Sequence, residues 1–156
     1  MRIAICAVGR LRAGPERTLI DDYLTRFDRT GRALGLGPAR VLEVEDRKGG
    51  GREAEAALLD KAAPAGAVRI ALDEHGRTLT SPDFAARLGA WRDEGRGEAA
   101  FLIGGADGLG GGLAEGADLR LSLGQMVWPH MLARLMLAEQ LYRAATILAG
   151  SPYHRV

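Results

Sequence analysis

The stretch Ala99-Ala100-Phe101-Leu102-Ile103, followed directly by Gly104-Gly105, decides the expected fold. Five apolar residues in succession predict a strand that is buried on both faces, as in a parallel sheet covered by helices on its two sides. Residues 2–8 and 69–72 are similar apolar runs, and weaker strand patterns cover residues 41–45 and 119–123. Candidate strands are therefore spread along the whole chain.

Helical patterns alternate with these strands. Pro15 opens the first helix, residues 52–63 form the second, Ser81 and Pro82 supply the N-cap and first turn of the third, and residues 129–149 form the last. This alternation predicts an α/β fold with a parallel sheet and helices on both faces. Since there is no internal repeat or low-complexity linker, a single domain over residues 1–156 is expected.

Length and composition agree with one domain. The 156 residues, 47% of them hydrophobic, suffice for one sizeable core. No apolar run approaches the roughly 20 residues of a membrane span, and the first residues lack a secretory signal, so we expect a cytoplasmic protein without a membrane partner. Cys6 is the only cysteine, which excludes an internal disulfide and a cysteine-based zinc site.

The charges are unevenly distributed. The formal net charge is only +1, but residues 1–52 carry 11 Lys and Arg against 7 Asp and Glu. Arg47, Lys48 and Arg52 surround three glycines, and this flexible basic loop is a candidate contact for an RNA phosphate backbone. A solvated loop that only connects two elements is an equally good interpretation.

Two segments follow strands, where ligands bind in open parallel sheets. Residues 104–112 hold six glycines in nine, which lets the backbone approach a ligand closely. Residues 121–130 run from a strand through a mostly apolar loop into the last helix. Such a loop forms an adenine pocket if its backbone groups face inward. Taken alone, the first segment is more simply a mobile turn and the second a part of the core.

Common catalytic and nucleotide motifs are missing. The sequence contains no Gly-x-Gly-x-x-Gly spacing, no P-loop lysine, no His-Glu-x-x-His and no Gly-x-Ser-x-Gly. A conventional dinucleotide, ATP or metal site is therefore not expected.

Four separated motifs occur in order along the chain. They are Phe101-Leu102-Ile103-Gly104-Gly105, residues 121–130, Leu137-Ala138-Glu139-Gln140-Leu141-Tyr142-Arg143-Ala144 and Pro152-Tyr153-His154-Arg155. Together they resemble the ribosomal RNA large-subunit methyltransferase H family, small SPOUT-class enzymes that methylate N3 of a pseudouridine in 23S ribosomal RNA. The resemblance covers the whole chain, and its last third carries most of the specificity.

The resemblance implies a C-terminal trefoil knot, a homodimer with the last helix at its interface, and S-adenosyl-L-methionine as methyl donor. It places the donor among nine residues: Leu72, Gly104, Gly105, Leu123, Gly124, Gln125, Met126, Val127 and Trp128. Two segments depart from the family's pattern. Ala106-Asp107-Gly108 replaces Pro-Glu-Gly, and residues 124–127 read Gly-Gln-Met-Val instead of Ser-Lys-Met-Thr. A pocket made chiefly of backbone groups tolerates such changes.

Methyl transfer to an imide nitrogen needs alignment of that nitrogen with the S–CH3 bond and a group that takes its proton. The resemblance puts the tail beside the transferred methyl, so Tyr153 and His154 are the catalytic candidates, with His130 as an alternative base. Arg143 and Arg155 are candidate RNA contacts. The simpler alternatives are a disordered tail and, for Arg143, a surface ion pair on its own helix.

Three function classes follow from these observations. A methyltransferase acting on 23S ribosomal RNA is the expected function. Its rival is a non-catalytic RNA-binding or ribosome-associated module with the same fold, and binding of the methyl donor separates the two. A small α/β enzyme that uses another nucleotide is disfavoured because the phosphate-binding motifs are missing.

Overall fold

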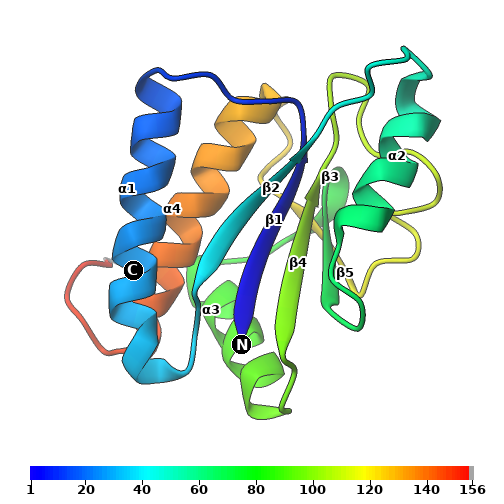
Figure 1. The fold of residues 1–156 in the computed structure, drawn as a ribbon. Helices are drawn as coiled ribbons and strands as arrows, with labels where there is room; N and C mark the ends of the chain where they lie inside the picture. The colour runs from blue at the N-terminus through cyan, green and yellow to red at the C-terminus, as the bar shows by residue number, and fades with distance from the viewer. Residues whose placement is uncertain (155–156) are drawn as a thin grey trace.

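The computed structural model describes residues 1–154 and has an α/β fold built on a five-stranded parallel sheet (Figure 1). In spatial order the strands are β2 (Ala39–Val44), β1 (Arg2–Val8), β4 (Glu98–Ile103), β3 (Val68–Thr78) and β5 (Leu119–Ser122). Because the strands are parallel, their carboxyl ends gather at one edge of the sheet, at the top of Figure 1. We call this the carboxyl edge and the opposite one the amino edge.

Helices cover both faces of the sheet, as predicted. α1 (Pro15–Gly31), α3 (Ser81–Asp93) and α4 (His130–Leu148) lie on one face, and α2 (Gly51–Ala62) lies on the other (Figure 1). A short 3-10 turn, Arg32–Leu34, follows α1. Within residues 1–154, no helix is long and apolar enough to cross a membrane.

The strand β1 contributes to both layers of the core because its side chains alternate between the two faces of the sheet. Ile3 and Ile5 belong to the core beneath α1, α3 and α4, whereas Ala4 and Cys6 belong to the core beneath α2. All four are fully buried, because successive side chains of a strand point to opposite faces. Burial raises the pKa of the Cys6 thiol to about 11. Cys6 is therefore a small core residue, as its place in an apolar strand predicts.

The start of α3 corrects one detail of the sequence analysis. The predicted N-cap, Ser81, is wrong. Thr80 caps the helix, since its hydroxyl accepts a hydrogen bond from the N–H of Asp83 at 3.1 Å. The hydroxyl of Ser81 instead donates to Oε1 of Gln140 on α4 at 2.8 Å. Both residue types cap helices well, so the choice depends on how α3 packs against α4.

β3 departs most from its predicted bounds, because it continues well past Leu72. Its pairing with β5 shifts register between Leu72 and Arg77. Asp73, within this irregular part, accepts hydrogen bonds from Arg120 of β5 at 2.6 and 3.0 Å. A Cβ on Gly76 would lie 2.7 Å from the carbonyl oxygen of Arg120, so glycine permits this close approach. The trefoil knot implied by the resemblance stays a prediction.

A charged cluster joins three strands at the amino edge. Glu98, the first residue of β4, is only 6% exposed. Its carboxylate pairs with Arg40 of β2 at 2.9 Å and with Arg2 of β1 at 3.4 Å. The two arginines neutralise a buried carboxylate that would otherwise be costly.

Candidate functional site

The predicted donor-binding residues come together at the carboxyl edge from three strands. β3 lies between β4 and β5 in the sheet. Leu72 lies in β3, Gly104 follows β4 and Leu123 follows β5, so the three residues come from three adjacent strands. Ligands of open parallel sheets bind at this edge. The structure therefore places the two sequence-predicted loops after the strands that flank β3, and we call residues 104–112 the glycine loop and residues 123–129 the second loop.

The glycine loop is tightly folded where it leaves the sheet. The N–H of Gly108 donates to the carbonyl of Gly105 at 3.0 Å, and these two residues form a β-bridge. A Cβ on Gly104 would lie 2.5 Å from the carbonyl of Gly108. Only glycine fits at position 104, and the turn is a defined structure rather than the mobile connection considered above.

The helix α2 packs against the glycine loop and hydrogen-bonds to it. Arg52 donates two hydrogen bonds to the carbonyl of Leu109, at 2.9 Å from Nε and 2.6 Å from Nη2. A Cβ on Gly110 would lie 2.8 Å from Cγ of Arg52. Arg52, predicted as an RNA contact, thus uses its guanidinium to hold the loop.

Gly105 lies against a second side chain of α2 that the sequence analysis missed. A Cβ on Gly105 would lie 2.9 Å from Oε2 of Glu55 and 3.2 Å from Cγ1 of Val8. This carboxylate oxygen is shielded from solvent and has no hydrogen-bond partner within residues 1–154. Nothing in the α2 sequence sets Glu55 apart from the other acidic residues of the helix, so only the tertiary structure reveals it.

The second loop presents apolar side chains to solvent. Met126 is 72% exposed, Val127 80% and Trp128 40%, and Gln125 is also exposed. At the start of the loop, the hydroxyl of Ser122 bonds to the carbonyl of Gly124 at 2.9 Å and to its N–H at 3.1 Å. The loop therefore has a fixed base and an exposed apolar surface that a ligand or another subunit can cover.

A groove of about 490 Å³ connects the second loop with the middle of α4. Leu123 and Gly124 lie at one part of its wall, and Tyr23 of α1 and Glu139 of α4 at another. Its volume is typical of a small-molecule site. Of the nine predicted donor-binding residues only Leu123 and Gly124 line it, so the groove borders the predicted donor site.

The C-terminal tail folds back on α4. The hydroxyl of Tyr153 donates to Oε1 of Glu139 at 3.2 Å, and its ring lies 4.5 Å from that of Tyr142. Burial and the nearby negative charge of Glu139 raise the pKa of Tyr153 to about 12. Arg143 pairs with the same Glu139 at 2.6 Å and lies 5.4 Å from the Tyr153 ring centre. Arg143 thus forms the ion pair on its own helix that was the simpler alternative.

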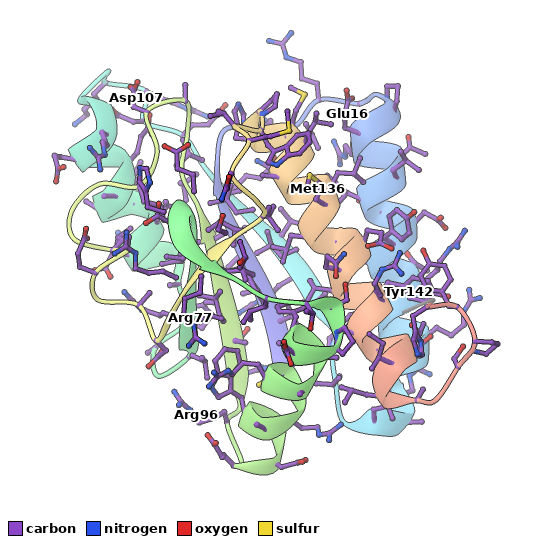
Figure 2. All side chains as sticks on the ribbon, turned by 180° about the vertical axis from the view of Figure 1, so that it is seen from behind. Glu16, Arg77, Arg96, Asp107, Met136 and Tyr142 are labelled. Carbon is purple, nitrogen blue, oxygen red and sulfur yellow. The ribbon has the colours of Figure 1, made fainter. Side chains whose placement is uncertain are left out.

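This tail is remote from the two loops of its own chain. At 1.5 Å per residue, Glu139 lies about 14 Å along α4 from the helix start at His130, to which the second loop leads. In Figure 2, Asp107 of the glycine loop is at the upper end of the molecule, whereas Tyr142 lies well down α4. His154, half-buried, has an Nδ1 without a hydrogen-bond partner among the described residues. Arg155 lies outside the described residues.

Two predicted RNA contacts are exposed at the carboxyl edge. Arg47 and Lys48 follow β2 and are accessible to solvent. The N–H of Lys48 donates to the carboxylate of Asp46 at 3.2 Å, which shapes the loop while the lysine side chain stays outside. These residues can contact a phosphate backbone without moving the glycine loop.

The start of α4 carries a buried polar cluster that the sequence analysis missed. Arg134 donates to Oε2 of Glu43 at 2.8 Å and to the carbonyl of Gly9 at 3.1 Å. His130, one turn earlier, has its Cε1 3.6 Å from where a Cβ on Gly9 would lie, and its Nδ1 is buried without a hydrogen-bond partner in the described part of the chain. A lone arginine within the apolar stretch of α4 was the available signal for this cluster.

The comparisons with known proteins agree with this architecture. The model of a family described as "Predicted SPOUT methyltransferase" matches residues 1–154. Proteins named ribosomal RNA large subunit methyltransferase H, from Dinoroseobacter shibae and Ruegeria pomeroyi, are each 71% identical over 156 residues, covering 100% of both chains. A counterpart from Cereibacter sphaeroides strain ATCC 17029 is 67% identical over the same full length.

A solved structure shows a similar fold at low sequence identity. The structure of a probable methylase family protein from Haemophilus influenzae Rd KW20 matches with a TM-score of 0.53 and 13% identity. The match covers 99% of this chain and 70% of that chain. At this identity it is the fold that is shared.

Proposed function

The chain belongs to the SPOUT methyltransferase family, and we propose that it transfers the methyl group of S-adenosyl-L-methionine to N3 of a pseudouridine in 23S ribosomal RNA. Its relatives of 71% identity are named ribosomal RNA large subunit methyltransferase H, and the chain is a methyltransferase of the same substrate class. The motif resemblance points to the pseudouridine at position 1915. We further propose that it acts in the cytoplasm, where ribosomes are found.

The observation that carries the proposal is that both loops follow, at the carboxyl edge, the two strands that flank β3. The turn after β4 requires glycine at position 104, because a Cβ there would lie 2.5 Å from the carbonyl of Gly108, and the side chains of Met126, Val127 and Trp128 offer apolar surface to an adenine ring. These features fit a donor that combines a planar base with a flexible amino-acid part. When bound, S-adenosyl-L-methionine supplies an electrophilic methyl group, and the chain's own task is to orient the accepting nitrogen toward it.

Two histidines are candidates to take the proton of the imide nitrogen. His130 lies at the start of α4 directly after the second loop, and its Nδ1 has no partner in residues 1–154. His154 has the same property but lies with the tail beside α4. Histidine is the side chain that titrates closest to neutral pH, which suits proton transfer under physiological conditions. We assign this role to His154, with Tyr153 as the base-stacking surface.

That assignment requires a second subunit. The tail of one chain rests near Glu139, away from its own loops. In a two-fold dimer with antiparallel α4 helices, the end of one helix lies beside the start of the other. The partner subunit's Tyr153 and the partner subunit's His154 would then reach the loops of this chain.

The groove face supports such a homodimer. Leu19 of α1 is an exposed large apolar residue, and Leu135 and Met136 of α4 line the same groove. Figure 2 shows Met136 on the face of α4 turned toward the viewer. An exposed apolar patch that spans two helices is normally covered by another protein surface. Sedimentation should show a dimer, Met136→Glu should yield monomers, and Ala57→Glu on the exposed face of α2 should not. A monomeric wild-type protein with full activity would refute this assembly.

Two measurements test the proposed function. Calorimetry should detect binding of S-adenosyl-L-methionine to the wild-type protein. Ribosomes that lack the modification should then take up a labelled methyl group at one pseudouridine of 23S ribosomal RNA. Donor binding without label in any ribosomal RNA, tested on free RNA, large subunits and whole ribosomes, would favour the non-catalytic module instead. Absence of donor binding would reject the proposal.

A further inference from the structure

The carboxylate of Glu55 occupies an unusual position next to the glycine loop. Its Oε2 is shielded from solvent and lacks a hydrogen-bond partner in the described part of the chain. The atom lies 2.9 Å from the Cβ position of Gly105, which in turn lies 3.2 Å from Val8 at the end of β1. Glu55 therefore faces the loop that we propose to hold the methyl donor.

A shielded carboxylate oxygen without a donor is energetically unfavourable. Removing a carboxylate from water costs free energy unless hydrogen bonds or a cation compensate. The nearest cation on α2, Arg52, directs its guanidinium to the carbonyl of Leu109. None of the ion pairs of residues 1–154 includes Glu55. A partner from outside the chain would satisfy this oxygen.

We propose that Glu55 is a donor-positioning residue that accepts a hydrogen bond from the α-ammonium group of S-adenosyl-L-methionine, an inference that rests on the proposed function. The donor carries two cationic centres, its ammonium and its sulfonium. Only the ammonium has N–H groups, and an unpaired acceptor is satisfied by N–H donors. The amino-acid end of the donor then lies against α2, and its adenine ring extends toward the second loop.

Three ligands separate the possible partners of this carboxylate. S-adenosyl-L-methionine has both cationic centres, S-adenosylhomocysteine has the ammonium alone, and 5′-methylthioadenosine has neither. Calorimetry should show that Glu55→Gln binds S-adenosyl-L-methionine and S-adenosylhomocysteine more weakly than the wild type, by a similar factor of about ten or more, because a hydrogen bond between charged groups contributes about that much to affinity. The affinity for 5′-methylthioadenosine should equal that of the wild type. Glu94→Gln, an exposed change of the same kind at the end of α3, should bind all three normally.

Thermal unfolding distinguishes positioning of the donor from a structural role. Without ligand, Glu55→Gln should unfold at or above the wild-type temperature, because the variant replaces a carboxylate of which one oxygen is shielded and has no hydrogen-bond donor in the described part of the chain. With S-adenosyl-L-methionine it should gain less stabilisation than the wild type does. A lower unfolding temperature without ligand would assign Glu55 a structural role and overturn the proposal.

The remaining outcomes are also decisive. If only S-adenosyl-L-methionine binds more weakly, the carboxylate faces the sulfonium and the assignment to the ammonium is wrong. If all three ligands bind normally but methyl transfer fails, Glu55 acts on the RNA and the proposal is overturned. If the wild-type protein binds S-adenosyl-L-methionine and Glu55→Gln binds it equally well, the role of Glu55 fails while the proposed function stands. Absence of binding by the wild type rejects both.

Discussion

Arg134 of α4 and Glu43 of β2 form an ion pair of 2.8 Å although the arginine side chain is only 2% exposed. The same guanidinium donates to the carbonyl of Gly9, just after β1. One side chain thus connects the start of α4 to the ends of two strands. Since the second loop leads directly into α4, this pair also fixes where that loop ends.

Replacing Arg134 by Met should destabilise the protein. The change removes the donor of the Gly9 carbonyl and one of the two donors of the Glu43 carboxylate, which keeps the N–H of Leu11, and an acceptor left without its donor costs about 1–3 kcal/mol. Urea unfolding measures this loss. Arg17→Ala is the matched control, because Arg17 forms an exposed pair with Asp21 at 3.9 Å, and such pairs contribute little. Equal stability of the two variants would contradict the structural importance of the Arg134–Glu43 ion pair.

The same pair predicts a stability loss in acid. Burial acts to raise the pKa of Glu43, but hydrogen bonds from the N–H of Leu11 and from Arg134 outweigh it and hold the pKa below 4.5. A lowered pKa in the folded state contributes stability that is present above the unfolded value and lost as pH falls through the folded value. The free energy of unfolding should therefore decrease below about pH 4.5, and Glu43→Gln should flatten this decrease. An identical pH profile for both proteins would exclude Glu43 as a cause.

The two glycines after β4 should respond differently to alanine. In Gly104→Ala the new methyl group would meet the backbone of Gly108 at 2.5 Å, so we expect a loss of about 1–3 kcal/mol in stability. In Gly105→Ala it would meet the movable side chain of Glu55, so the protein should stay folded and bind S-adenosyl-L-methionine roughly tenfold more weakly. Unfolding and calorimetry on both variants check this contrast. A folded Gly104→Ala with normal affinity would show that the turn adapts.

The basic residues around the tri-glycine segment should have separable effects. Arg47→Ala and Lys48→Ala should weaken ribosome binding and lower its salt dependence by about one unit of slope each, as loss of a phosphate contact does. Arg52→Ala should mainly weaken donor binding, because it releases the carbonyl of Leu109. Binding measured over a series of salt concentrations, together with donor calorimetry, tests the division. A common effect of all three changes on RNA alone would restore Arg52 as an RNA contact.

Deleting residues 153–156 should spare donor binding and abolish methyl transfer. In the described part of the tail, Tyr153 packs on α4 beside Glu139 and Tyr142 rather than on the loops that we propose to bind the donor. His154→Gln should slow turnover while leaving the affinity for ribosomes near normal, since it removes a proton acceptor rather than a charge contact. Full activity of the truncated protein would mean that the proton acceptor is His130 or a group of the RNA.

Much of the fold was predictable because its signals are local. The apolar runs of β1 and β4 are buried on both faces, and that burial forces their composition. The continuation of β3 past Leu72 was not predictable in this way. Its polar residues are held by pairing with β5 and by the Asp73–Arg120 ion pair, which are contacts between distant parts of the chain.

The same distinction between local sequence signals and contacts between distant parts of the chain applies to the candidate site. The two loops were identified from glycines and apolar residues that follow strands, which is a sequence pattern. Glu55 and Arg134 were missed because their importance comes from what lies opposite them, Gly105 in one case and Glu43 in the other. The remoteness of Tyr153 from the loops also depends on where α4 ends, and a linear motif carries no such information.

The charged cluster of Glu98, Arg2 and Arg40 fixes the register of β4 relative to β1 and β2. A parallel strand can slide by two residues and keep the same faces buried, and each such slip moves it about 6.6 Å. Sliding β4 past its neighbours would carry Glu98 away from both arginines and leave a carboxylate in the interior without counter-charges. The slip would also carry Gly105 away from Glu55 of α2. The position of the glycine loop at the carboxyl edge thus depends on a charge cluster at the opposite end of the sheet.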